Sequence, residues 1–306
     1  MMGIEFMKEV PFENIYIHPL VKDENGQKMS KSKGNVIDPL KLIDLYGSDA
    51  LRFTLANLST QGRDIKLSNK LVENSRNFIT KIWNVARFSQ FNNFTYDKNF
   101  TPDSIKLSVN KWILFRFLKT QKKVIKNLES FKFNLVISDL YHFIWNDFCD
   151  LYIELSKNYL KEKKNKEEIS GTFNYIFCKS LNLINPVIPF ITEKIGKDLG
   201  YIKKSFFNEL INKDIKLIKD TKTIIEFNNF IEFLKKVRTE VGNTESIDSK
   251  LIILSKKKIE WIDKNIFLIN SIFKFDKIEY KLNFDNTNKK IILIQGVKFF
   301  ITTAEI

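Results

Sequence analysis

The chain has 306 residues, of which 43% are hydrophobic and 28% are charged, so it can bury a substantial core and disorder is not indicated. Its formal net charge of +14 favours a polyanionic partner, because a positive field attracts phosphate-rich ligands and releases their counterions. Two cysteines and two histidines, with no CxxC pair, show no disulfide framework and no zinc site, which agrees with a reducing cytoplasm. We expect no membrane span and no targeting segment, since the longest uncharged run is too short to cross a bilayer.

The first 21 residues hold two short apolar runs, residues 1–4 and 15–21. The second run alternates enough to predict a strand. This strand would deliver the polar loop that follows it.

The loop at 28–35 carries the chemistry of a phosphate-binding segment. Its five leading residues are Lys28, Met29, Ser30, Lys31 and Ser32, followed by Lys33, Gly34 and Asn35. The ammonium groups, hydroxyls and flexible backbone N–H donors suit a ligand with several negative oxygens. The alternative from composition alone is an ordinary solvated loop.

Helices are predicted directly after the loop. Asp38 and Pro39 form a strong helix start and Gly47 a stop, after which Ser48 is expected to cap a second helix that ends at Leu58. Residues 62–65 read as a turn. Ser68 is expected to open a third helix, whose stripe at helical spacing is Leu71, Ser75, Phe78, Ile82 and Val85.

The middle of the chain predicts a helical bundle. A polar connection at 89–107 precedes helices at 108–129 and 134–161, with Cys149 expected to be a small buried hydrophobe. Residues 161–168 read as a charged, solvated loop, and a further helix is expected at 171–184. Pro186 and Pro189 should break and restart the chain over 185–193.

From about residue 221, the sequence pattern changes from long helical runs to short β-rich runs. A helix at 224–237 is followed by four short β-rich runs, 251–254, 277–282, 291–294 and 297–302. A small α+β unit is therefore predicted at the C-terminal end.

The string Lys-Met-Ser-Lys-Ser at 28–32, with Gly34 and Asn35 after it, resembles the second signature of class I aminoacyl-tRNA synthetases. The flanks at 16–18, 23–27 and 35–40 are similar to the valyl, isoleucyl and leucyl branch. Residues 73–78, 81–84 and 86–88 are similar to valyl-tRNA synthetases in particular, and residues 145–154 resemble that family's anticodon-binding bundle.

The resemblance implies a mainly α fold in three parts. Residues 1–66 would be the end of a Rossmann catalytic domain with stem-contact helices, 67–220 an anticodon-binding helical bundle, and 221–306 the small α+β unit. The implied function is ATP-dependent activation of valine and its transfer to valine tRNA. Lys28 and Lys31 would be catalytic, and 28–32 as a whole would bind ATP, which brings Mg²⁺ with it; no metal ligand of the chain's own is expected.

Two other hypotheses stay open. The valine pocket, the first signature and the editing domain of the resembled family lie mostly outside these residues, so the isolated chain is expected to be inactive and could instead be a non-catalytic tRNA-binding module. Isoleucyl or leucyl specificity is the second alternative, which residues 81–84 disfavour.

Overall fold

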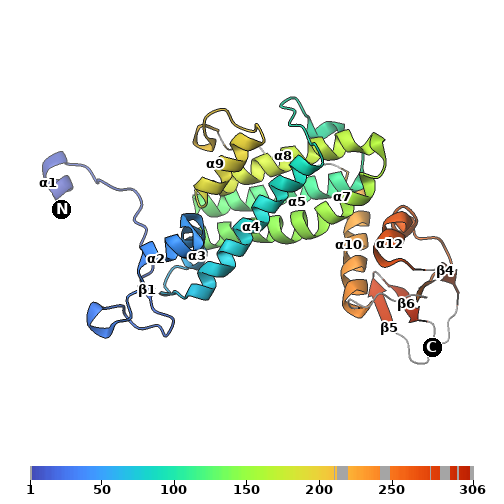
Figure 1. Ribbon diagram of the computed structural model, residues 1–306, viewed down its shortest axis with the longest axis horizontal. Coiled ribbons are helices and arrows are strands. Elements are labelled where there is room, and N and C mark those ends of the chain that lie inside the picture. The colour runs from blue at the N-terminus through green and yellow to red at the C-terminus, as the bar shows by residue number, and fades with distance from the viewer. Residues whose placement is uncertain are drawn as a thin grey trace. The chain divides into compact units, whose positions relative to one another are not determined.

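A computed structural model describes residues 2–209, 211, 220–241, 249–275, 277–282, 290–294 and 296–303. Helices dominate, as predicted (Figure 1). The described residues form two compact units that interleave along the chain. The first takes residues from 2–96, 117–147 and 174–211, and the second from 97–116, 148–173 and 220–303. The predicted three-part domain division remains a prediction.

The first unit begins with α1 (Met2–Met7) and an extended segment that leads to β1 (Val21–Lys22). The strand prediction for 15–21 was wrong except at Val21, because Ile15 and Ile17 are exposed and pair with no other strand in the described part of the chain. β1 pairs in parallel with β2 (Ile65–Lys66), and Lys22 Nζ contacts Asp64 Oδ2 at 2.6 Å. This two-stranded sheet pairs the segment before the phosphate loop with the segment that follows α3.

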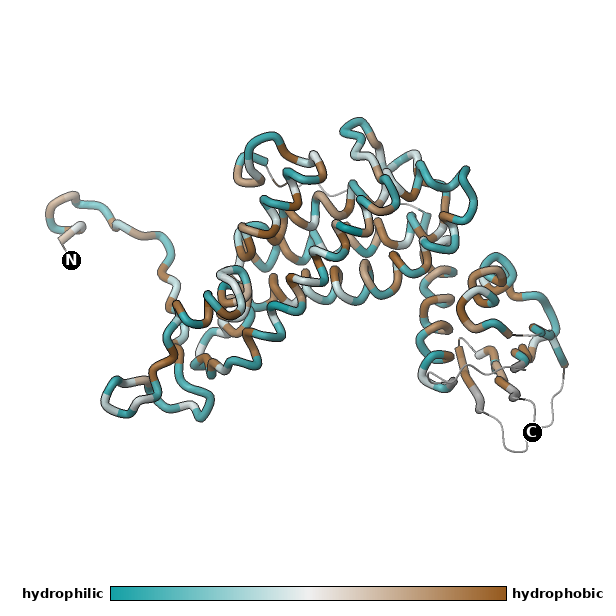
Figure 2. Tube along the Cα trace, viewed as in Figure 1, coloured by the Kyte–Doolittle hydropathy of each residue, from teal (hydrophilic) through white to brown (hydrophobic). Residues whose placement is uncertain are grey.

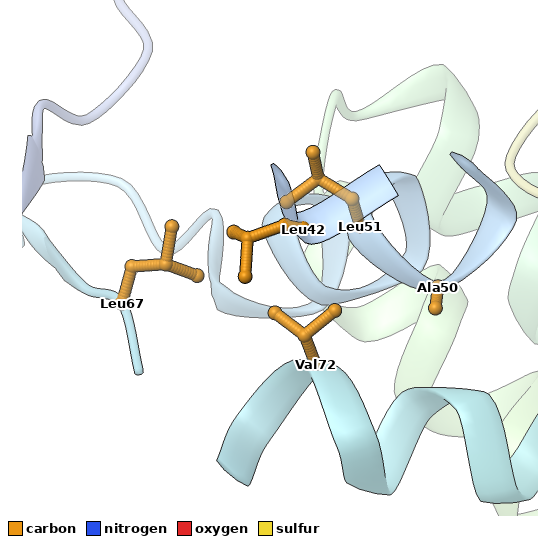
Figure 3. Packing of buried hydrophobic residues seen from close by; sticks show 5 residues of the cluster. All are labelled: Leu42, Ala50, Leu51, Leu67 and Val72. Atoms are coloured by element: carbon orange, nitrogen blue, oxygen red, sulfur yellow. The ribbon is translucent and has the colours of Figure 1, made fainter. Parts of the chain in front are cut away.

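Three helices follow the loop in the chain and pack on one another: α2 (Pro39–Tyr46), α3 (Ser48–Leu58) and α4 (Asn69–Phe91). Their cluster of buried residues consists of Leu42, Ala50, Leu51, Leu67 and Val72 (Figure 3). Gly47, at φ 89°, ends α2 as predicted. It is also the residue that precedes α3, so Ser48 is the first helical residue rather than the cap we predicted.

The rest of the first unit is built from the later part of α5 (Ser108–Glu129), α6 (Phe133–His142), the later part of α8 (Lys166–Ile184) and α9 (Pro189–Asp198). Hydrophobic and hydrophilic residues alternate around these helices (Figure 2). An aromatic group links α6 to α3 and α4: Phe78 of α4 lies 4.9 Å from both Phe53 of α3 and Tyr141 of α6, measured between ring centroids. The amphipathic pattern predicted from sequence therefore buries one face of each helix.

The helix predicted over 134–161 contains a π-helical segment, η3 (Phe143–Ile153), between α6 and α7 (Glu154–Tyr159). Hydrogen bonds in a π-helix join residues five apart, and Phe143, Phe148 and Ile153 stand at that spacing in the sequence. All three are buried. Cys149 is also buried, as predicted.

The second unit contains the predicted α+β part. Helix α10 (Thr221–Val241) precedes β3 (Ser249–Leu254), two short helices α11 (Glu260–Asp263) and α12 (Ile266–Phe273), and the strands β4 (Lys277–Lys281), β5 (Lys290–Ile294) and β6 (Val297–Thr303). The strand order is β4-β3-β6-β5. β3 is parallel to β4, whereas β6 is antiparallel to both β3 and β5. All four strands were predicted; the two short helices were not.

Early residues of α5 and α8 belong to this second unit as well. Trp112 donates from Nε1 to Asn228 Oδ1 at 2.9 Å, and Lys111 Nζ contacts Asp220 Oδ2 at 2.8 Å. Glu168 Oε1 accepts hydrogen bonds from the backbone N–H groups of Lys106 and Leu107 at 3.1 and 2.8 Å. The prediction of a solvated loop over 161–168 was therefore wrong at its end, where α8 has already begun at Lys166.

Candidate phosphate-binding loop and its helical support

The candidate loop leaves β1 through a tight turn. Gly26 donates its backbone N–H to Asp23 O at 2.9 Å, and Asp23 N donates to Gln27 O at 3.1 Å. Gly26 has φ +80°, a left-handed value that glycine adopts without steric cost. An antiparallel bridge between Lys22 and Lys28 then sets the start of the loop against β1.

Asp23 and Asn35 hold the two ends of the loop together. Asp23 is 7% exposed; its Oδ1 accepts from Gln27 N at 2.7 Å and its Oδ2 from Asn35 Nδ2 at 2.8 Å. Asn35 Oδ1 in turn accepts from Ser30 N at 2.9 Å. The hydrogen bond from Asn35 and then that from Gln27 lower the pKa of Asp23, because they stabilise its charged form.

The central residues form one 3-10 turn, η1 (Lys31–Lys33), which Gly34 closes at φ 67°. The hydroxyls of Ser30 and Ser32 lie 3.2 Å apart. Lys28, Lys31 and Ser32 are exposed, whereas Met29 and Ser30 are half-buried. Within the described residues, no carboxylate lies within 4.0 Å of the ammonium group of Lys28, Lys31 or Lys33. The turn thus presents unpaired cations and hydroxyls on an anchored backbone.

The structure brings together all five predicted site residues in one loop, but it adds two that sequence reasoning did not single out as functional. Asp23 and Asn35 stand 12 residues apart and were noted only as flanks of the string. The available signal was chemical: an aspartate before a Gly-containing turn and an asparagine after the loop form a donor–acceptor pair that can close it.

Helix α3 is bound to the start of α9 by hydrogen bonds of two of its side chains. The buried Asp49 carboxylate accepts from Ile191 N at 2.7 Å and Phe190 N at 3.3 Å, which satisfies free N–H groups at the start of α9. One turn later, Arg52 donates to Val187 O at 3.0 Å and Pro186 O at 2.8 Å. We call Asp49, Arg52 and their four backbone partners the α3–α9 clamp. Burial raises the pKa of Asp49, and the two N–H donors only partly offset this.

The clamp explains a string that otherwise looks like an ordinary helix with one exposed arginine. Asp49 and Arg52 are separated by three residues, so they lie on one face of α3. Both reach the break between α8 and α9 that Pro186 and Pro189 create, where backbone groups lack intrahelical partners. The predicted break is confirmed, since α8 ends at Ile184 and α9 begins at Pro189.

Two family models match the chain. "tRNA synthetases class I (I, L, M and V)" matches residues 1–68, which contain the whole loop, and "Anticodon-binding domain of tRNA ligase" matches residues 110–260. The chain is 36% identical to the valine–tRNA ligase of Rhizobium meliloti over 295 residues, which covers 92% of this chain and 31% of that protein. The chain belongs to the valine–tRNA ligase family.

Other relatives agree with this assignment. The valine–tRNA ligase of Bradyrhizobium diazoefficiens is 49% identical over 197 residues, covering 64% of this chain and 21% of that protein. The chain thus spans about a fifth to a third of the length of these curated valine–tRNA ligases. A solved ternary complex of an Agrobacterium radiobacter leucyl enzyme, titled LeuRS-tRNA-LeuAMS, has a TM-score of 0.54 at 16% identity and covers 88% of this chain and 32% of that one. This likeness shows the same fold.

In the described residues, no helix is both long enough and apolar enough to cross a membrane. The same residues contain no group of three or more His, Cys, Asp or Glu side chains placed to hold a metal ion.

Proposed function

We propose that this valine–tRNA ligase chain supplies the ATP-phosphate loop and the tRNA-reading helices of an enzyme that activates valine with ATP and esterifies valine tRNA in the cytoplasm. The observation that carries the proposal is the loop itself: unpaired lysines and two hydroxyls on a turn that Asp23 and Asn35 hold closed. The similarity to valine–tRNA ligases supports the choice of valine over isoleucine or leucine.

In the activation step, the valine carboxylate attacks the α-phosphate of ATP and the bond to the β-phosphate breaks, so that valyl-adenylate forms and pyrophosphate leaves. Lys28 and Lys31 would bind the β- and γ-phosphates and offset the charge that builds up on the leaving group. Ser30 and Ser32 would donate to phosphate oxygens. Mg²⁺ would arrive with the triphosphate.

The shape of the loop suits this role. Gly26 and Gly34, both at positive φ, flank the cations and allow the turn to close over a ligand. The hydrogen bonds of Asp23 and Asn35 keep the base of the loop fixed while its tip stays exposed. An anchored base with a solvated tip lets the lysines move onto the phosphates without unfolding β1.

The helical body would then hold the tRNA, whose 3′-terminal hydroxyl attacks the acyl carbonyl and releases AMP. Exposed lysines on α5, among them Lys119, Lys122 and Lys126, can contact phosphates. Lys111, on the same helix, instead pairs with Asp220. Aromatic side chains and basic groups on helices are the usual means of reading unpaired RNA bases.

Fluorescence anisotropy with a labelled valine-tRNA transcript tests the proposal. We expect the chain to bind it with an affinity that falls at least about tenfold between 50 and 200 mM salt, because phosphate contacts release counterions. Lys122→Gln should weaken binding, whereas Lys157→Gln, whose ammonium pairs with Glu154 at 2.6 Å, serves as the control. Binding that is absent, or unchanged over this salt range, would contradict the proposal.

A further inference from the structure

A partly open pocket of about 310 Å³ lies among α3, α4 and α6, in the first unit. This volume is at the small end of the range of about 300–1,000 Å³ found for small-ligand sites. No residue of the phosphate loop lines the pocket, and in the sequence α2 lies between that loop and the lining residues. Its residues take no part in the α3–α9 clamp.

The floor of the pocket is closed by satisfied hydroxyls. Thr54 Oγ1 and Ser75 Oγ lie 2.7 Å apart, and each is also within hydrogen-bond distance of a backbone carbonyl oxygen, that of Ala50 at 2.8 Å and that of Leu71 at 3.1 Å respectively. Phe53 and Leu71 form an apolar part of the pocket wall. The floor therefore offers shape and apolar contact rather than unused hydrogen-bonding groups.

The rim differs from the floor, because most of its polar side chains have no hydrogen-bond partner among the described residues. Two amides, Asn57 and Asn74, and two hydroxyls, Ser138 and Tyr141, line it, and none of them makes a hydrogen bond to another described residue. His142 has one ring nitrogen, Nδ1, 3.3 Å from Asn146 Nδ2, which leaves Nε2 for a ligand. Four unused polar side chains and an imidazole thus converge on one small pocket.

The chemistry of the lining selects the ligand class. No lining residue carries a permanent charge, so the pocket suits a neutral group better than a phosphate or a cation. Asparagine offers a donor and an acceptor side by side, which matches the hydrogen-bonding edge of a nucleobase. Tyr141 supplies an aromatic face that is itself supported by Trp145, with ring centroids 5.6 Å apart and planes inclined by 20°.

Cations lie next to the rim, where the backbone of a bound nucleotide would run. Lys70 is exposed and one helical turn before Asn74 on α4. Lys81 lies over the ring of Trp145 at 3.8 Å from its centroid. A neutral pocket beside cations is the arrangement expected for one base of an RNA strand, and not for a free neutral metabolite.

We infer that this pocket binds a single unpaired nucleobase of the tRNA, outside the anticodon; this rests on the proposed function. The position outside the anticodon follows from α3, which lines the pocket and belongs, like the phosphate loop, to residues 1–68 that match the class I synthetase model. The chemistry at that loop involves the 3′ end of the tRNA, and the anticodon lies at the opposite end of the molecule.

Chemical probing of a valine-tRNA transcript tests the inference. Dimethyl sulfate modifies unpaired adenine N1 and cytosine N3, and a water-soluble carbodiimide modifies uracil N3 and guanine N1. With the wild-type chain bound, we expect protection of one unpaired base outside the anticodon. Asn57→Leu/Asn74→Leu should abolish that protection and lower affinity about 5- to 30-fold, with an unchanged salt slope because no charge is removed.

Asn77→Leu is the matched control, since Asn77 is an exposed asparagine on α4 that does not line the pocket. It should keep both the protected base and the affinity. Wild-type binding without a protected base outside the anticodon, or with one that the double variant leaves protected, would overturn the pocket assignment and leave the proposed function standing. If the wild-type chain does not bind the transcript, both fail.

Discussion

Lys31 and Lys33 lie in the same exposed 3-10 turn, and only the first belongs to the five-residue string. In a complete ligase that carries this segment, Lys31→Ala should slow valyl-adenylate formation by about 10²–10³-fold, since a preorganised cation is worth most where charge develops. Valine binding should change little, because the loss falls on the transition state. Stopped-flow measurement of adenylate formation checks this.

Lys33→Ala is the control and should slow valyl-adenylate formation much less than Lys31→Ala does. Thermal melts of both variants should match the wild type, because exposed loop lysines make few buried contacts. Equal slowing by the two substitutions, or an effect of Lys31→Ala that follows a lowered melting temperature, would show the role of Lys31 to be wrong.

The hydrogen bond from Asn35 to Asp23, which holds the two ends of the loop together, gives a second prediction. Asn35→Ala should raise the pKa of Asp23 towards its ordinary value of 3.8, because the Asn35 side chain is the largest cause of the lowering. Gln27→Ala should leave the pKa where it is, since Gln27 donates from its backbone. NMR titration of the Asp23 carboxyl carbon measures both. An unchanged Asp23 pKa in Asn35→Ala would mean that this hydrogen bond does not close the loop in solution.

The residues of this loop show which parts of the candidate site could be predicted from the sequence. The lysines were found because a short string of ammonium and hydroxyl groups has a recognisable chemistry. Asn35 was not singled out because its role depends on reaching back to Asp23 across a turn, and that distance is fixed only when Gly26 adopts positive φ. The candidate loop was therefore predictable, whereas the contacts that shape it were not.

The α3–α9 clamp makes the junction of two helices pH-dependent. Folding raises the pKa of Asp49, so the folded state holds this proton more tightly than the unfolded state. The contribution of Asp49 to stability is then fully present below the unfolded pKa of 3.8 and is lost as the pH rises through the folded pKa. Asp49→Asn, which keeps an oxygen acceptor, should remove this pH dependence.

Asp49→Ala leaves the first N–H groups of α9 without their cap and should lower the free energy of unfolding by about 0.5–2 kcal/mol. Asp38→Ala is a useful comparison, because Asp38 caps α2 through Leu40 N at 2.9 Å but is exposed. Urea unfolding between pH 4 and 8 compares the three variants. If Asp49→Asn retains the wild-type pH dependence, another group is responsible for it.

Helix boundaries were predicted best where local chemistry decides them. The starts at Pro39 and Pro189 follow from a capping aspartate or a proline, and the start at Asn69 comes directly after Ser68 as predicted. The π-helical segment was missed because a stripe of apolar residues does not tell hydrogen bonds between residues four apart from hydrogen bonds between residues five apart. Glu168 was missed because its partners lie about 60 residues away in sequence.

Across the whole molecule, the sequence predicted most of the elements, and the domain boundary at residue 221 stays a prediction. The second compact unit also includes residues 97–116 and 148–173, which the sequence did not link to the C-terminal part. Trp112 shows the reason, because its ring lies 5.8 Å from Phe227 and its Nε1 donates to Asn228. Such contacts between distant segments leave no periodic signal.

This grouping predicts that the second unit loses stability first in acid. Its Asp220, paired with Lys111, and Glu260, paired with Lys264 and Lys222, have pKa values lowered to about 2, from 3.8 and 4.5 respectively. A group whose pKa is lowered on folding stabilises the protein above its unfolded pKa, and this contribution is lost as the pH falls towards the folded value. The loss should therefore run from about pH 4.5 down to 2. In the first unit, Asp23 and Asp64 follow the same trend with smaller downward pKa shifts, and the raised pKa of Asp49 opposes it.

The four tryptophans separate the two units, since Trp112 and Trp261 lie in the second and Trp83 and Trp145 in the first. Trp83→Phe/Trp145→Phe leaves reporters only in the second unit, and Trp112→Phe/Trp261→Phe leaves them only in the first. Between pH 5 and 2.5, the urea midpoint reported by the second unit should fall further than that of the first. Lys111→Met should flatten the fall, and so should 0.5 M NaCl, because both sets of ion pairs are accessible to solvent and salt screens them. Equal falls for the two reporter sets would contradict the assignment of these ion pairs to acid stability.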